Sequence, residues 1–247
     1  MKYLLDTTDT VPAGVGFDLF GLTHLLWLAV FLVFAVCSCV VYRNLRSTQR
    51  EKMRLIFAAA LIADEIFKYI ILVIGDRWLA DYLPLHLCSV NIFLIAFHAV
   101  RPGKLLDNFL YTVCIPGAMA ALLFPSWASL PFPNLMHLHS FTIHMLLVVY
   151  PVMLTCAGEI RPSARYVPKC IVLLLVLCIP GIIVNFLCGS NFMFLMYAEP
   201  GNPLYFFEQL WGNHLLGLPV LIGAVVVLMH APRLLLKGLF ERRHSVY

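Results

Sequence analysis

Charged residues are scarce in this chain of 247 residues, since Asp, Glu, Lys and Arg together make up 12% of it. Soluble proteins carry roughly 25%. The sequence also lacks a soluble domain, an internal repeat and a low-complexity tract, and residues 1–19 have no apolar core of the kind found in a cleavable signal peptide. Because 62% of the residues are hydrophobic, the sequence predicts an all-α, polytopic membrane helix bundle that forms one domain over residues 1–247.

Recognised catalytic motifs are absent as well. The chain contains no HExxH zinc motif, no phosphate-binding glycine loop and no GxSxG nucleophile motif. The eight cysteines are irregularly spaced inside apolar stretches, which favours small buried apolar residues over a metal or redox site. We therefore expect no metal and no cofactor. The net charge of +4 lies in short loops and does not indicate a nucleic-acid partner.

Seven stretches are long and apolar enough to cross a membrane, for which a helix needs about 20 residues. They are residues 20–42, 54–75, 84–101, 105–125, 134–157, 167–188 and 211–232. The sequence thus predicts an N-terminal segment over residues 1–19, a seven-helix bundle over 20–232 and a basic tail over 233–247.

Lys and Arg are almost absent from alternate connections between these stretches. One set of connections and the tail hold 14 of the 17 basic residues, whereas the other set holds only Lys2 and Arg77. Cytoplasmic loops are enriched in Lys and Arg. We therefore expect the N-terminus outside, the C-terminus in the cytoplasm and the chain in the cell membrane. Membrane lipids are the expected partners, and the sequence does not indicate an oligomeric state.

The densest group of polar residues in an apolar stretch begins at Pro84, which we expect in the first turn of the third helix. His86, Cys88, Ser89 and Asn91 follow within two turns. A lipid-facing helix has no use for so many polar groups. We interpret this segment as one wall of a polar pocket in the outer half of the membrane.

Two other helices are expected to supply the opposite wall. In the second helix, Asp64 and Lys68 are four residues apart and share a face. They either form a pocket wall or proton relay, or neutralise each other as a structural pair. In the fifth helix, His137 and His144 share a face with Ser140 between them, and each histidine is a candidate base or a structural donor. The connection over residues 189–208, which includes Asn191, lacks Lys and Arg and is expected to cap the pocket or to form an ordinary aromatic belt.

Five segments, in this order and spacing, resemble the YwaF-like family of bacterial integral membrane proteins. Its eukaryotic relative is transmembrane protein 164, an acyltransferase that acts on ether phospholipids. The segments are Asp-Glu-Ile-Phe-Lys (64–68), Leu-Pro-Leu-His-Leu (83–87), Ala-Leu-Leu-Phe-Pro (121–125), Ile-His-Met-Leu-Leu-Val-Val-Tyr-Pro (143–151) and Asn-Phe-Met-Phe-Leu (191–195).

The resemblance implies acyl transfer by a cysteine and a histidine in the eukaryotic branch. His144 matches the histidine that serves as base there, whereas the position of the cysteine is occupied by Leu85, which cannot be acylated. Cys88 or Ser89 could replace the nucleophile, or His144 could activate a lipid hydroxyl directly, or the bacterial protein could have another activity.

The leading hypothesis is a membrane-embedded lipid acyltransferase. In it, His144 is the general base, His86 stabilises the oxyanion and Cys88 is a candidate nucleophile, while Asp64, Lys68, Asn91, His137, Ser140 and Asn191 line the pocket. The alternative is a transporter or small-ligand-binding protein that uses the same pocket, since charged residues inside a membrane also mark proton-coupled carriers. A scaffold for another membrane protein is a third interpretation.

Overall fold

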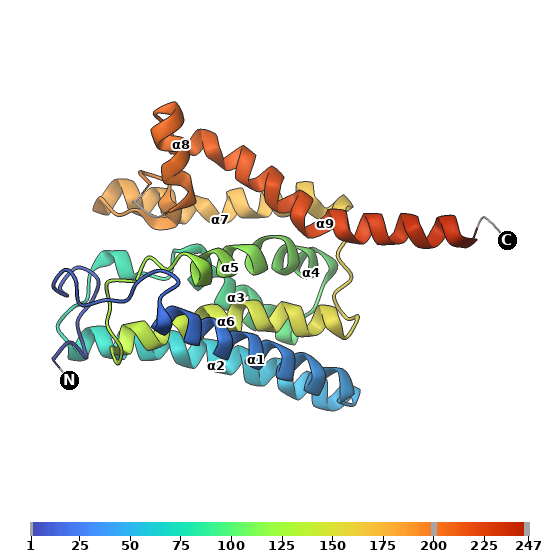
Figure 1. The fold of residues 1–247 in the computed structure, drawn as a ribbon, viewed down its shortest axis with the longest axis horizontal. Coiled ribbons are helices and arrows are strands. Elements are labelled where there is room, and N and C mark those ends of the chain that lie inside the picture. The colour runs from blue at the N-terminus through green and yellow to red at the C-terminus, as the bar shows by residue number, and fades with distance from the viewer. Residues whose placement is uncertain (1, 199–201, 245–247) are drawn as a thin grey trace.

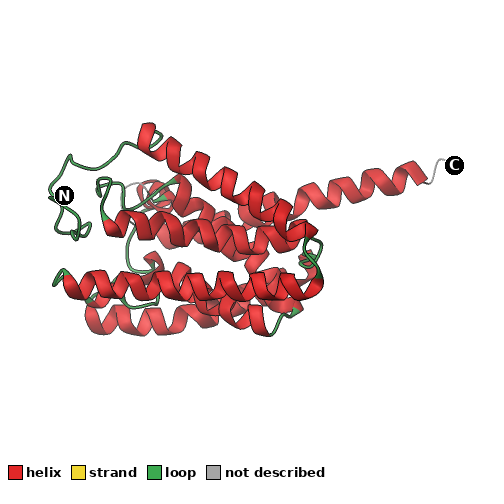
Figure 2. Cartoon of the chain, turned by 90° about the horizontal axis from the view of Figure 1, so that it is seen from below, coloured by secondary structure: helices red, strands yellow, loops and turns green. Residues whose placement is uncertain are grey.

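The computed structural model describes residues 2–198 and 202–244, with side chains described up to Ala231. Within these residues the chain is helical and contains no strand (Figure 2). The α-helices are α1 (Leu22–Asn44), α2 (Ser47–Ile74), α3 (Leu87–Val100), α4 (Lys104–Phe109), α5 (Ile115–Leu123), α6 (Leu135–Cys156), α7 (Val167–Cys188), α8 (Pro203–Trp211) and α9 (Gly217–His244). Short turns of 3-10 helix lie at Ala80–Tyr82, Ala164–Tyr166, Phe192–Phe194 and His214–Leu216, and a π-helix joins α4 to α5 over Leu110–Cys114.

Six segments of the described chain are long and apolar enough to span a membrane. They are Leu22–Asn44, Ala80–Val100, Lys104–Leu123, Leu135–Cys156, Ala164–Cys188 and His214–Ala231. The remaining predicted span, 54–75, forms most of α2, which runs alongside α1 and α6 in the bundle (Figure 1). Helix α2 is not among the six segments because Asp64, Glu65 and Lys68 lie within its apolar part. The predicted polytopic helix bundle is confirmed, and the chain is an integral multi-pass membrane protein.

The helices form a bundle with α6 at its centre and a layer of α7, α8 and α9 on one side (Figure 1). Helix α6 packs against α1, α2 and α5. Most of its side chains are buried, as expected for a helix surrounded by others. Large apolar side chains on α1 and α7, among them Leu22, Val33, Phe186 and Leu187, are more than half exposed and are available to lipid.

Several predicted helix boundaries are wrong. Pro84 does not open α3, because Pro84 and Leu85 form a turn, His86 is the extended N-cap residue and the helix begins at Leu87. The residue before a proline avoids helical geometry, and Leu83 accordingly has ψ of 150°. The predicted helix 105–125 corresponds to the span Lys104–Leu123, but its α-helical pattern is interrupted by the π-helix just before Pro116, whose missing N–H and ring are incompatible with a regular turn.

The predicted helix 211–232 is wrong at both ends. A separate helix, α8, precedes it, capped by the side chain of Asn202 at its start and by Gly212, with φ of 70°, at its end. The last long helix, α9, then begins at Gly217 and continues to His244, so most of the predicted tail 233–247 is helical. Residues 199–201 of the predicted capping connection and 245–247 of the tail lie outside the described residues.

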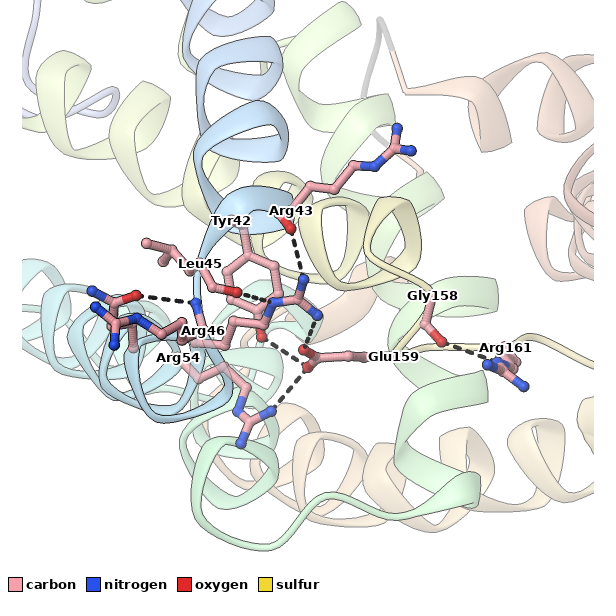
Figure 3. Close-up of polar contacts among 10 residues, drawn as sticks. Tyr42, Arg43, Leu45, Arg46, Arg54, Gly158, Glu159 and Arg161 are labelled. Atoms are coloured by element: carbon pink, nitrogen blue, oxygen red, sulfur yellow. Dashed lines mark hydrogen bonds and ion pairs between the residues drawn. The ribbon is translucent and has the colours of Figure 1, made fainter.

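The basic connections gather at one end of the bundle, which we call the basic end (Figure 1). There, Glu159 accepts hydrogen bonds from Arg50 and Arg54, at 3.2 and 2.9 Å, and from the hydroxyl of Tyr42 at 2.8 Å (Figure 3). Glu159 follows α6, whereas its partners come from α1 and α2. These contacts tie together the ends of three helices.

The opposite end, which we call the N-terminal end, is closed by residues 2–19. Asn134 donates from its side chain to the carbonyls of Tyr3 and Asp6, at 2.6 and 2.9 Å. The N–H of Phe17 donates to the carbonyl of Ala128 at 2.9 Å. The N-terminal segment therefore packs on the connection between α5 and α6, and that connection carries Trp127.

Candidate functional site

Polar side chains from α2, α6, the N-cap of α3 and the α5–α6 connection lie in the same region near the N-terminal end of the bundle. His144 lies within electrostatic range of Asp64, His86 and His139. The imidazole of His144 also stacks on the indole of Trp127, with centroids 4.9 Å apart and planes 17° from parallel. We call these five residues the His144 cluster.

His144 has one engaged and one free ring nitrogen. Its Nδ1 lies 2.6 Å from the carbonyl oxygen of Ser140, one helical turn earlier. A carbonyl only accepts hydrogen bonds, so Nδ1 carries the proton and Nε2 carries the lone pair. No described residue hydrogen-bonds to this Nε2. The predicted pocket residue Ser140 thus contributes its backbone carbonyl, which fixes the tautomer that a general base requires.

His86 has the complementary tautomer. Its Nδ1 accepts a hydrogen bond from the backbone N–H of Met193 at 3.4 Å, which leaves the proton on Nε2. The ring packs against Phe192, with centroids 4.9 Å apart. Met193 and Phe194 have φ of 57° and 55°, a left-handed conformation that is uncommon for residues other than glycine. Such strain often accompanies functional sites, and here it presents a backbone donor to His86.

The charged residues of α2 pair differently from the prediction. Lys68 donates to Glu65 at 2.5 Å rather than to Asp64, and both side chains of this pair are buried. Asp64 instead accepts a hydrogen bond from Thr142 at 3.1 Å and lies 3.3 Å from Nδ1 of His139. Spacings of three and four residues both allow contact on a helix, so the sequence alone did not determine which carboxylate would pair with Lys68.

Cys88 and Asn91 lie on α3 and make no hydrogen bond to the cluster. Cys88 is partly buried and within electrostatic range of Lys68 and Glu65. Asn91 is buried, and its side-chain oxygen has no hydrogen-bond partner. Among the described residues, neither Cys88 nor Ser89 makes a hydrogen bond to His144.

Two predicted pocket residues have other surroundings. His137 is fully buried, accepts from the indole of Trp27 at 2.9 Å and donates to the carbonyl of Leu130 at 2.9 Å, so both ring nitrogens are engaged in joining elements. Asn191 directs its side chain to its own connection, where it binds the backbone of Met196 and Tyr197. Neither side chain belongs to the His144 cluster.

Three residues that sequence reasoning did not assign to the site contribute to it or support it. Trp127 stacks on His144, while Thr142 and His139 contact the carboxylate of Asp64. The sequence does indicate that His139 and Thr142 lie together, because they are three residues apart on α6 and so share a face of the helix. No group of three or more His, Cys, Asp or Glu side chains forms a metal site in the described parts of the chain.

The cysteines differ from their prediction. Only Cys114 and Cys170 are buried, whereas Cys37, Cys156 and Cys188 are exposed on the sides of the bundle. An apolar thiol facing lipid needs no partner, so the apolar composition that made these residues look buried reflects the membrane and not the protein core.

Comparison with known proteins identifies the family. No curated protein and no solved structure matches the chain. A family model described as the TMEM164 family matches residues 19–230, which include every helix from α1 to α8 and the first half of α9. The chain belongs to the TMEM164 family.

Proposed function

We propose that this protein is a lipid acyltransferase of the cell membrane, with His144 as its general base. The observation that carries the proposal is the free Nε2 of His144, held in the basic tautomer by the carbonyl of Ser140. Within the family, Leu85 in place of a cysteine and the segment 191–195 support placement in the YwaF-like branch. Membrane lipids are the partners in this proposal, and nucleic acid is not one.

In this reaction, the acyl group passes from the ester of a lipid donor to the hydroxyl of an acyl acceptor. Nε2 of His144 takes the hydroxyl proton as the oxygen attacks the ester carbonyl carbon. The Nε2–H of His86 donates to the oxyanion that forms there. The bond to the donor's alcohol then breaks, and that alcohol takes the proton from His144. Since Leu85 has no nucleophilic atom and Cys88 does not hydrogen-bond to His144, the acceptor's own hydroxyl is the nucleophile.

A groove on the outside of α2 supports entry of an acyl chain from the side. It has a volume of about 390 Å³ and is lined by Ile66, Tyr69, Ile70, Val73 and Ile74. The ring of Tyr69 lies against Lys68, whose ammonium is 4.7 Å from the ring centroid. The groove thus lies next to Lys68, which is within electrostatic range of His86 in the cluster.

The alternative of a proton-coupled carrier rested on Asp64 and Lys68 as a pair exposed to a cavity. Each of the two has its own local partner, Thr142 for Asp64 and Glu65 for Lys68. This arrangement favours a structural role for Lys68, and we do not propose the carrier.

Replacement of His144 tests the proposal. We expect His144→Gln to lower acyl transfer in reconstituted vesicles by at least 100-fold, because general-base catalysis contributes roughly 10²–10⁴. Expression and melting temperature should stay near those of the parent. Cys88→Ala should retain activity. Mass spectrometry of the lipid products provides the measurement.

His137→Gln is the matched control, since it changes a histidine of the same helix that is bonded to Trp27 and Leu130. It should lower the melting temperature but keep the activity per folded molecule. Unchanged transfer by His144→Gln would refute the proposed base, and loss of transfer in Cys88→Ala would show that Cys88 is the nucleophile.

A further inference from the structure

The indole N–H of Trp127 is an unused donor in a buried place. Trp127 is 6% exposed, and its Nε1 has no hydrogen-bond partner. A buried polar group without a partner costs roughly 1–3 kcal/mol, and buried indoles usually find an acceptor. The orphaned donor is therefore available to an acceptor atom of a bound molecule.

The ring that carries this donor stacks on the imidazole that carries the free acceptor of the His144 cluster. The stacked arrangement of the two rings, 17° from parallel, keeps the in-plane N–H of Trp127 from pointing at the imidazole nitrogen. The two groups therefore cannot satisfy each other. One donor and one acceptor remain on two stacked rings, and each needs a third group.

A single oxygen atom that bears a proton matches both requirements. An alcohol hydroxyl donates through its hydrogen and accepts through its lone pairs. An ammonium group only donates, and a thiol does both weakly. A hydroxyl at the edge of the stacked rings would give its proton to Nε2 of His144 and accept from Nε1 of Trp127.

We propose that Trp127 is a substrate-binding residue that holds the reacting hydroxyl of the acyl acceptor against His144. This inference rests on the proposed function and adds a residue to its machinery. The indole N–H fixes the oxygen from which His144 takes the proton, and it stabilises the negative charge that develops there as the proton leaves.

The first test compares Trp127→Phe with the parent, using the full chain in phosphatidylcholine vesicles with hexadecanol as acceptor. Phenylalanine keeps an aromatic ring on His144 but lacks the N–H. We expect the KM for hexadecanol to rise at least tenfold, with the dependence on donor lipid unchanged. Trp78→Phe, at a half-exposed position outside the cluster, should behave as the parent. An unchanged KM in Trp127→Phe would overturn the inference while leaving the acyltransferase in place.

If Trp127→Phe does not fold, 3-benzothienylalanine at position 127 replaces it, because this residue has the shape of tryptophan with sulfur in place of N–H. The same rise in KM is expected. Full activity of this variant would overturn the inference.

The second test needs no catalysis. The chain has four tryptophans, so protein labelled with 5-fluorotryptophan gives four ¹⁹F resonances, and Trp127 is assigned by its loss in Trp127→Phe. We expect hexadecanol to shift the Trp127 resonance and hexadecane to leave it unchanged. Equal responses to both compounds, or no response to either, would overturn the inference. A shift with hexadecanol together with absent acyl transfer would support the hydroxyl site and refute the proposed function.

Discussion

At the scale of single residues, three buried histidines of the described chain connect elements through both ring nitrogens, whereas His144 keeps one nitrogen free. His24 accepts from the N–H of Phe20 and donates to the carbonyl of Leu122, and His137 is similarly engaged through both nitrogens. His98 lies between the hydroxyl of Tyr150 and the carboxylate of Asp107, at 2.8 Å from each. Such bonds satisfy buried imidazoles and connect helices. His144 is satisfied on one nitrogen only, which separates its role from theirs.

The pair of Glu65 and Lys68 should behave as one unit. Removal of one partner from a buried ion pair leaves an uncompensated charge and costs about 3–5 kcal/mol. We therefore expect Glu65→Gln and Lys68→Met to lower the unfolding free energy in detergent by that amount, and the double variant to lose less than either single variant. Additive losses would show that the two residues act independently.

Asp64→Asn is the companion variant, because it changes the neighbouring carboxylate without touching Lys68. It keeps an oxygen that accepts from Thr142 and should cost less than Glu65→Gln. A larger loss in Asp64→Asn would favour Asp64 as the true partner of Lys68.

At the scale of elements, the connection after α7 covers His86. Asn185, near the end of α7, accepts from the N–H of Phe192 at 2.7 Å and donates to its carbonyl at 3.2 Å. A methyl group on Gly181 of α7 would lie 3.4 Å from the Cβ of Phe192, so Phe192 also packs closely on α7. One side chain thus holds the strained backbone that donates to His86.

Asn185→Ala should release this connection. The N–H and carbonyl of Phe192 would lose their buried partners, and we expect hydrogen exchange of the amides over residues 191–195 to become at least tenfold faster, as for a loss of about 1.4 kcal/mol of local stability. Mass spectrometry of exchange in detergent measures this.

Asn202→Ala is the control, since Asn202 caps α8 through the N–H of Leu204 and should affect only that helix. Equal exchange over residues 191–195 in Asn185→Ala and the parent would contradict the proposed attachment.

The apolar stretches predicted the long helices because a membrane requires about 20 apolar residues in a row. The ends of α7 were predicted at the observed residues, since Gly189 ends the helix with φ of 70°. Local chemistry overrode the pattern elsewhere: Asn202 and Pro203 start α8 inside a predicted connection, and a π-helical turn before Pro116 interrupts the α-helical pattern of the fourth span.

The site was predictable only in part. Facing positions on α6 identified His144, because its place within the helix follows from periodicity. The partner of Lys68 depended on a choice between two permitted spacings, and the role of Trp127 depended on how the α5–α6 connection folds over α6. Neither contact follows from the order of residues along a single helix.

At the scale of the whole molecule, the two layers meet over the π-helix. The hydroxyl of Tyr111 donates to the carbonyl of Met229 at 2.8 Å, and the hydroxyl of Thr112 lies 3.1 Å from Nε2 of His230. Tyr111 and Thr112 belong to the π-helix, whereas their partners belong to α9. The break in the fourth span therefore lies where α9 joins the bundle, and the α7–α9 layer lies over it (Figure 1).

The orientation of the bundle follows from its charged ends. The connections between α1 and α2, α3 and α4, and α6 and α7 carry the Lys and Arg residues and lie at the basic end (Figure 1). Because cytoplasmic loops retain Lys and Arg, we expect this end to face the cytoplasm and Thr8, at the N-terminal end, to face outward. Intact cells treated with a membrane-impermeant maleimide should label Thr8→Cys above the parent background, and Arg101→Cys should be labelled only after permeabilisation. Both positions are exposed, so labelling of Arg101→Cys in intact cells would place the basic end outside and, with it, the His144 cluster in the cytoplasmic half of the membrane.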